Sequence, residues 1–266
     1  MFHQWKVQNL KFYFNGSENF YRFKIFKQNL KKIRKHNANP DKTHTQDINK
    51  FSDLTEDEFV RIYAGLNLDS QENADIKMYS DTSVSSSWDW VEKGAVNQVK
   101  NEGMCGGAVW AFTSAAVLEG SYFLKTGALD SFSEQQLVDC LYTYNPCNEG
   151  GFPVDAFKYW QTSAAETSTS YPFTQSKGKC NYKPELGVAK VKSYNQVQGT
   201  TDQLTAAVHS QPASVGIEAN VLQSYSSGVI QASECGTSIN HTVLMVGYDV
   251  DQAYFRMQNS WGSNWG

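Results

Sequence analysis

One periodic pattern near the start of the chain limits its fold more than any other feature. Six residues separated by three or four positions lie on one face of a single long helix, where such spacings place side chains. They are Glu18, Arg22, Phe26, Asn29, Ile33 and Asn37. The helix should end near Asn39-Pro40, because a residue before proline avoids helical backbone angles. The pattern predicts a long helix as the first large element.

Two shorter signals follow this helix. Residues 47–55 alternate like a short strand, and Thr55 with Glu58 has the spacing of a capping box that opens another helix. Residues 69–87 are polar and rich in serine, without strong periodicity. Such a stretch is typical of a linker and of a segment open to proteases.

The rest of the chain divides into a helical part and a part rich in strands. Helical patterns cover residues 108–125, 133–140 and 152–161. Strand patterns cover residues 213–218, 241–250 and 253–258, with a short helix at 200–210. Helices followed by strands favour the α+β class, with a cleft between two lobes.

Charge and hydropathy exclude two classes of partner. The formal net charge of −4 gives no reason to expect nucleic-acid binding. Residues 1–80 carry 13 basic against 10 acidic side chains, and residues 81–266 carry 10 against 17. This asymmetry fits either two domains of different composition or a basic N-terminal segment that docks on an acidic body. No apolar run approaches the roughly 18 residues that a membrane span needs, and Met1–Leu10 has no secretory signal pattern.

The five cysteines are an odd number. Four of them fall within 76 residues, and Cys235 stands apart. This arrangement suits two disulfides, one remaining thiol and an oxidising compartment. Because no signal peptide is visible, either the N-terminus is incomplete or the cysteines are reduced.

Several motifs carry a family resemblance. The pattern from Glu18 to Asn37 matches, in all six places, the pro-segment signature of cathepsin L-like zymogens, and Asn49, Phe51 and Asp53 resemble the second signature of that segment. Motifs similar to those of the mature papain family then follow in family order; they are Ser87–Gly103, Gln135–Cys140, Cys147–Gly151, Tyr171-Pro172, Asn240-His241, Val246–Tyr248 and Asn259–Gly262. Over nearly its whole length the chain resembles a cathepsin L-like cysteine protease zymogen of the papain family.

This resemblance implies a fold and its boundaries. The expected architecture is the α+β papain-like fold, with a helical lobe and a β-barrel lobe, preceded by a helical inhibitory pro-domain that lies along the cleft. We expect the pro-segment over residues 1–68, a linker over 69–83 and the peptidase domain over 84–266, with the last strands of the family domain missing. The resemblance implies no cofactor and no metal.

The resemblance also assigns most of a catalytic constellation. A cysteine protease needs a thiol beside an imidazole, and a third group that orients this imidazole. By resemblance His241 is the base, Asn259 orients it, and the indole of Trp261 covers the pair. His241 lies 133 residues after Ala108 and Asn259 lies 151 after it, which agrees with the family interval of roughly 130–150 residues.

The nucleophile position departs from the family pattern. The family signature is Cys-Gly-Ser/Ala-Cys-Trp, whereas Cys105 to Trp110 reads Cys-Gly-Gly-Ala-Val-Trp. Counting from Cys105 places Ala108 at the nucleophile, and counting back from Trp110 places Val109 there. Neither side chain is nucleophilic, and the next hydroxyl belongs to Thr113. One extra residue stands between the two landmarks.

A second departure concerns the oxyanion. Where the family has a glutamine that donates its side-chain amide, this chain has Glu102. An ionised carboxylate only accepts hydrogen bonds and repels an oxyanion. Loss of one such donor typically lowers the rate by about 10²–10³, and loss of the nucleophile by roughly 10⁶. The two changes together predict no measurable hydrolysis.

The remaining assignments also come from the resemblance. Disulfides should join Cys105 to Cys147 and Cys140 to Cys180. Extra residues in both partner loops, at Ala108/Val109 and at Glu149, either preserve the first bridge or turn Cys105 toward the site as a nucleophile. The walls of the pocket for the residue two before the scissile bond correspond to Phe152, Pro153 and Thr242, which would favour an apolar or aromatic side chain there.

The sequence thus indicates a member of the papain-like cysteine endopeptidases that is catalytically impaired. The alternatives are an active cysteine endopeptidase, through Cys105 or through a true sequence that restores the cysteine, and a non-catalytic protein that binds peptides or inhibits proteases. The expected partners are a peptide or protein in the cleft and the chain's own pro-segment, with no nucleic acid and no membrane, and the expected state is a monomer. By resemblance the location is lysosomal, vacuolar or secreted.

Overall fold

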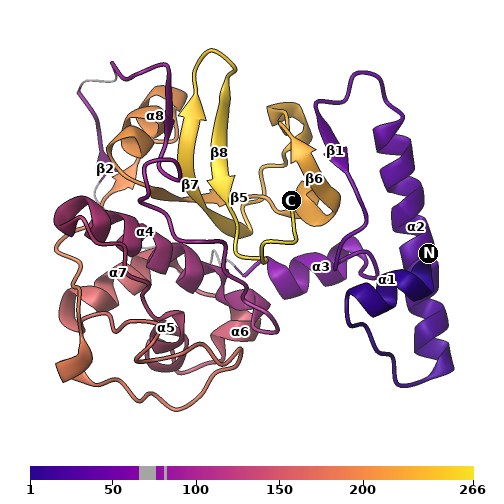
Figure 1. The fold of residues 1–266 in the computed structure, drawn as a ribbon, viewed down its shortest axis with the longest axis horizontal. Coiled ribbons are helices and arrows are strands. Elements are labelled where there is room, and N and C mark those ends of the chain that lie inside the picture. The colour runs from indigo at the N-terminus through magenta and orange to yellow at the C-terminus, as the bar shows by residue number, and fades with distance from the viewer. Residues whose placement is uncertain (66–75, 81–82) are drawn as a thin grey trace. The chain divides into compact units, whose positions relative to one another are not determined.

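A computed structural model describes residues 1–65, 76–80 and 83–266 of the chain (Figure 1). Most of the linker expected at 69–83 therefore lies outside the described residues. The chain forms two compact units. The first contains Met1–Ile62, Glu218–Ser238 and Asn264–Gly266, and the second contains Tyr63–Ile217 and Ile239–Ser263.

The first unit contains the long helix that the periodic pattern predicts. This helix, α2, spans Gly16–Asn37, between the short helix α1 (Phe2–Gln8) and α3 (Glu56–Tyr63). The predicted face is the one that makes tertiary contacts. Asn29 donates hydrogen bonds to the carbonyl oxygens of Ser52 and Leu54, and Arg22 pairs with Glu58 at 2.8 Å. The six-residue pattern therefore marks the face of α2 that holds the following turns.

The strand expected over residues 47–55 is wrong. These residues form turns, and the strand of this region, β1, is His44–Gln46. Asparagine explains the difference, because its side chain bonds to nearby backbone and favours turns. The Oδ1 of Asn49 accepts from the amide of Phe51, and its carbonyl accepts from the amide of Ser52. The capping box of Thr55 and Glu58 does form and opens α3.

Strand β1 pairs with a strand that lies far from it in the sequence. It pairs antiparallel with β6 (Tyr225–Gly228), where His44 lies opposite Gly228 (Figure 1). Gly228 has a φ of 95°, and a Cβ there would lie 2.6 Å from the carbonyl oxygen of Thr43. Only glycine combines this backbone angle with so close a neighbouring strand. The short helices η4 (Asn220–Ser224) and η5 (Ala232–Glu234) flank β6.

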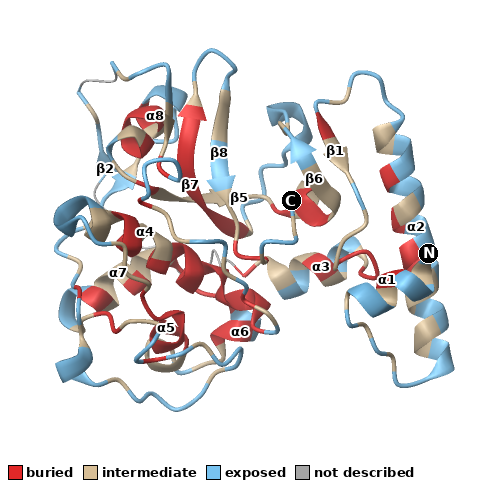
Figure 2. Ribbon diagram, viewed as in Figure 1, coloured by how far each residue is buried: buried red, intermediate tan, exposed pale blue. Residues whose placement is uncertain are grey.

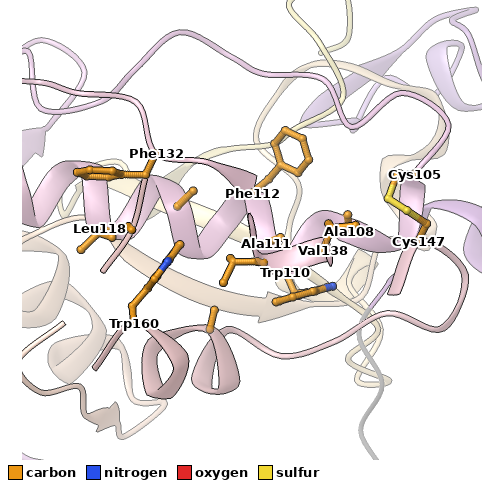
Figure 3. Close-up of a cluster of buried hydrophobic side chains, with 14 of the residues drawn as sticks. Cys105, Ala108, Trp110, Ala111, Phe112, Leu118, Phe132, Val138, Cys147 and Trp160 are labelled. Carbon is orange, nitrogen blue, oxygen red and sulfur yellow. A yellow bond between two sulfur atoms is a disulfide. The ribbon is translucent and has the colours of Figure 1, made fainter. Parts of the chain in front are cut away.

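The helical part of the second unit packs around one buried helix. This helix, α4, spans Val109–Thr126 and ends at Gly127, whose left-handed conformation caps it. Trp110 of α4 and Trp160 are both fully buried in the cluster of apolar side chains around it (Figure 3), and Leu137 belongs to the same cluster. The other elements of this part are η2 (Gly106–Ala108), α5 (Glu134–Cys140), α6 (Pro146–Glu149), α7 (Pro153–Thr162) and η3 (Pro184–Leu186).

An ion-pair network connects this helical part internally. The Nζ of Lys100 lies 2.6 Å from carboxylate oxygens of both Glu119 and Glu134. Both carboxylates are buried, so a single cation compensates two charges that water does not reach. Burial also raises the pKa of Glu134, although Lys100 opposes that shift.

A four-stranded sheet forms the rest of the second unit. Strand β7 (His241–Asp249) is buried along nearly its whole length (Figure 2) and pairs antiparallel with its three neighbours. These are β3 (Ser87–Asp89), β5 (Ala213–Ile217) and β8 (Tyr254–Gln258). Helix α8 is Thr201–Ser210, and β2 (Ile76–Lys77) pairs parallel with β4 (Gln196–Val197). The three strands predicted after residue 212 and the α+β class are confirmed.

Candidate active site

The expected nucleophile position lies where α4 begins. Ala108 is the last residue of η2 and Val109 is the first residue of α4, and neither side chain is exposed. The amide of Ala108 donates to the carbonyl oxygen of Cys105 over 2.9 Å. The extra residue of this motif is thus taken up as a turn of 3₁₀ helix before α4.

Cys105 is joined to Cys147 by a disulfide, and Cys140 is joined to Cys180 (Figure 3 shows the first bridge). These are the two pairs that the resemblance implies. Cys235 is the free cysteine, and its side chain is exposed. A bridged sulfur is neither a thiol nor a thiolate, so Cys105 offers no nucleophile in this state.

The loops that contain the two extra residues lie against each other. A Cβ on Gly107 would lie 2.5 Å from the carbonyl oxygen of Cys147 and 2.7 Å from that of Pro146. The backbone of η2 therefore packs directly on α6, where Glu149 is the last residue. The paired insertions are accommodated with the Cys105–Cys147 bridge intact.

The structure brings together the expected base, its orienting group and the covering indole. His241 opens β7, and its Nε2 lies 3.1 Å from the Oδ1 of Asn259. The ring of Trp261 lies against His241, with ring centres 4.9 Å apart. Because an amide oxygen only accepts, Nε2 carries a proton in this contact. The residues are positioned as the resemblance implies for a base, its orienting group and a covering indole.

Burial controls the ionisation of this imidazole. His241 is fully buried, and burial lowers its pKa to about 4, against the smaller raising effects of Asn259 and of a backbone hydrogen bond with Tyr63. An active cysteine protease holds its histidine charged beside a thiolate. Neither Ala108 nor Val109, at the expected nucleophile position, can form such an anion, and at neutral pH the imidazole of His241 is neutral.

The last residue of α3, Tyr63, and the two residues after it enter the same region. Tyr63 contacts Trp261 edge to face with ring centres 6.4 Å apart, and the carbonyl oxygen of Gly65 accepts a hydrogen bond from the amide of Gly151 over 3.1 Å. A Cβ on Gly65 would overlap the backbone of Gly107. Sequence reasoning did not identify Tyr63–Gly65. A glycine shortly after a predicted helix is a signal for close backbone approach.

Glu102 is fully buried beside the motif. Its amide donates to the carbonyl oxygen of Ser260, and its own carbonyl accepts from the amide of Cys105. The backbone of Glu102 therefore ties the nucleophile motif to the strand end that carries Asn259. Its side chain is the one that the resemblance expects at the place of the oxyanion-binding glutamine.

The expected specificity residues have separate environments. Phe152 is buried and caps the start of α7, where Pro153 is the first residue. The hydroxyl of Thr242 donates to the hydroxyl of Thr113, and that of Thr113 contacts the carbonyl of Thr242, which fastens α4 to β7. The hydroxyl of Thr242 is thus engaged inside the unit.

The described part of the chain contains no helix that is both long and apolar enough to cross a membrane.

Comparisons with known proteins show the family of this chain. The model of papain family cysteine proteases matches residues 84–266, and that of the cathepsin propeptide inhibitor domain matches residues 2–59. Fruit bromelain of Ananas comosus is 35% identical over all of this chain and 77% of its own length. A cathepsin L-like proteinase of Fasciola hepatica is 35% identical over all of this chain and 85% of its own.

Solved structures give the same result for the fold. The recombinant stem bromelain precursor has a TM-score of 0.88 and 34% identity, and covers all of this chain and 88% of its own. Digestive procathepsin L 3 of the Tenebrio molitor larval midgut has a TM-score of 0.85 and 32% identity, over all of this chain and 89% of its own.

Proposed function

The chain belongs to the papain family of cysteine proteases, and from this premise we propose that it retains the peptide site of the family while lacking the chemistry of hydrolysis. Its fold is the papain-like fold preceded by an inhibitory pro-segment. The observation that carries the proposal is the motif from Cys105 to Trp110. It contains a single cysteine, and that cysteine is bridged to Cys147.

The retained part of the site supports binding. His241, Asn259 and Trp261 keep the arrangement of a base, its orienting amide and a covering indole. The pairing of Gly151 with Gly65 is a main-chain hydrogen bond between distant parts of the chain. Backbone hydrogen bonds of this kind bind a peptide without depending on its side chains. A peptide with an apolar or aromatic residue two before the usual cleavage point is the proposed ligand, and Phe152 is the proposed wall of its pocket.

Activity through Cys105 is the competing function. It requires the bridge to Cys147 to be reduced and the sulfur to reach His241. It would also proceed without the donor that Glu102 replaces, at a rate lowered by about 10²–10³. The disulfide favours the impaired enzyme over this alternative.

A repair experiment tests the proposal. The native chain is compared with a variant in which Val109 is deleted and which carries Ala108→Cys and Glu102→Gln, using a fluorogenic peptide with Phe or Leu two before the scissile bond. The assay is run at mildly acid pH with reductant. We expect no hydrolysis by the native chain and clear hydrolysis by the repaired one. His241→Ala in the repaired background is the matched control and should abolish the recovered activity.

Two results would contradict the proposal. Hydrolysis by the native chain would mean that the nucleophile lies elsewhere. Absence of hydrolysis by both chains, when circular dichroism shows that both are folded, would mean that the peptide site is not retained. The location that we propose is a lysosomal, vacuolar or extracellular one, where the two disulfides are stable.

A further inference from the structure

A cluster of side chains that could bind a metal lies in the first unit, which contains none of the catalytic motifs. His36 belongs to the last turn of α2, His44 is the first residue of β1, and Glu234 is the last residue of η5. One potential ligand atom from each residue lies within 4.8 Å of the others. We propose that these three residues bind a divalent ion of the zinc class, which fastens β1 and α2 to residues 218–238.

His44 is the central residue of this cluster. Its side chain is 1% exposed, and its Nδ1 lies 3.3 Å from the Oε2 of Glu234. Within the described part of the chain, neither ring nitrogen of His44 makes a hydrogen bond of good geometry. Buried polar groups without partners are rare because each one loses its hydration. A metal ion on Nδ1 would supply the missing partner.

His36 already has the contact that a metal-binding histidine usually makes. Its Nε2 lies 3.0 Å from the backbone carbonyl oxygen of His44. Since a carbonyl only accepts, the proton is on Nε2 and the lone pair is on Nδ1. Metal-binding histidines usually donate their other N–H to a carbonyl or carboxylate in this way, which fixes the ring for coordination. The ring of His36 also lies against that of His44, with centres 4.2 Å apart.

Coordination requires the three ligand atoms, which lie within 4.8 Å of one another, to approach one another further. Zinc bonds of about 2.0–2.1 Å in a tetrahedron place ligand atoms roughly 3.3 Å apart. The distance from His44 Nδ1 to Glu234 Oε2 already has this value. The side chain of Glu234 is 35% exposed, so it can rotate toward a bound ion. Two imidazoles and one carboxylate are a common zinc donor set, and a water molecule would complete four-coordination.

The site is open to solvent. All three residues line a groove of about 830 Å³, whose walls come from α2, β1 and residues 218–236. Cys235 lines the same groove, but its sulfur is not among the clustered ligand atoms. An ion can therefore enter without unfolding, and it would join segments that are about 200 residues apart in the chain.

Zinc titration of the whole protein tests the site. The protein is stripped with a chelator, zinc chloride is added, and binding is measured by calorimetry together with the midpoint of thermal unfolding. We expect one equivalent to bind and the midpoint to rise, because an ion that binds only the folded state stabilises it. Cobalt(II) in place of zinc should give the visible absorption of a tetrahedral site.

Matched variants identify the ligands. His36→Gln and Glu234→Gln should each weaken zinc binding about tenfold or more and remove the cobalt spectrum. His3→Gln, an exposed histidine of the same segment, and Cys235→Ser should bind as the native chain does. Hydrogen exchange of the amides of His44–Gln46 should slow on zinc addition in the native chain and in these two controls, but not in His36→Gln or Glu234→Gln.

The proposal is overturned by any of three results: no saturable 1:1 binding, native-like binding by His36→Gln and Glu234→Gln together, or loss of binding in Cys235→Ser alone. The last result would mean that the thiol of Cys235, and not the proposed cluster, binds the zinc. His44→Gln is not the decisive variant, because His44 is buried and its replacement can alter folding.

Discussion

The backbone amide of Gly151 donates a hydrogen bond to the carbonyl oxygen of Gly65 over 3.1 Å. The backbone of Gly65, two residues after α3, is thereby held against the loop of Cys147–Gly151. Tyr63 completes the contact on the other side through Trp261 and the backbone hydrogen bond with His241. The site is thus occupied by the chain itself, over a segment of three residues.

Replacement of Gly65 by alanine should destabilise the second unit. The new methyl group would overlap the backbone of Gly107, which is held in turn by Cys147. Overpacking of this kind costs about 1–3 kcal/mol in the free energy of unfolding, measured by urea denaturation. Gly199→Ala is the control, since nothing lies within 4 Å of its added Cβ. Equal effects of the two substitutions would show that Gly65 is not enclosed.

The thiol chemistry of the native chain should involve Cys235 alone. The other four cysteines are bridged. Without reductant we expect one equivalent of a thiol-reactive chromogen to react, and none in Cys235→Ser. The reaction should be slow at neutral pH, because burial, with help from Glu234 and Glu218, raises the pKa of the Cys235 thiol. If peptide mapping instead finds the label on Cys105, this would support the alternative in which Cys105 is the nucleophile.

The stability of the protein should fall as pH decreases from about 6.5 to about 4. His241 has a pKa of about 4 in the folded chain and about 6.5 when unfolded, so in this window only the unfolded state takes up the proton. Its neutral burial stabilises the fold fully above pH 6.5, and about 3 kcal/mol of this is lost by pH 4.

The measurement is urea unfolding at several pH values for the native chain, His241→Gln and the control His3→Gln. The pH dependence should be shallower in His241→Gln and unchanged in His3→Gln. A residual slope in the same direction is expected from His44, since burial lowers its pKa as well. Identical slopes in all three chains would contradict the assignment to His241.

Removal of the Lys100 cation from the buried ion-pair network should strongly lower the stability of the protein. Lys100→Met leaves the carboxylates of Glu119 and Glu134 buried without their shared partner, which costs about 3–5 kcal/mol at neutral pH. The defect should shrink at acid pH, because protonation removes the uncompensated charges. Lys32→Met is the control. Its pair with Glu56 is exposed on both sides, so its loss should change stability by less than about 1 kcal/mol.

Much of the fold could be predicted because its signals are local. The face of α2, the cap at Ser133 and the glycine after α4 act within a few residues of themselves, and the structure contains each of them. Strand β1 could not be predicted in the same way. It is three residues long, and its pairing partner β6 lies about 180 residues later. A strand this short is defined by the neighbour that it meets rather than by its own alternation.

The residues of the candidate sites likewise differ in whether they could be predicted from the sequence. His241 and Asn259 are assigned by the family resemblance, with which their spacing agrees, and they lie together in the structure. Tyr63–Gly65 and the cluster of His36, His44 and Glu234 depend on which distant segments the fold brings into contact. No spacing rule relates residue 65 to residue 151, or residue 44 to residue 234, because their proximity exists only after folding.

Gly228 has a consequence for selectivity between related chains. It lies opposite His44 with a φ of 95°, and no side chain fits there beside the backbone of Thr43 and His44. A papain-family domain with any other residue at this place cannot receive the His44–Gln46 strand in this register without shifting its backbone. Suppose this pro-segment were supplied to other proteases in trans. It would then pair with those that have glycine at this place of the receiving strand, and not with those that have a larger residue there.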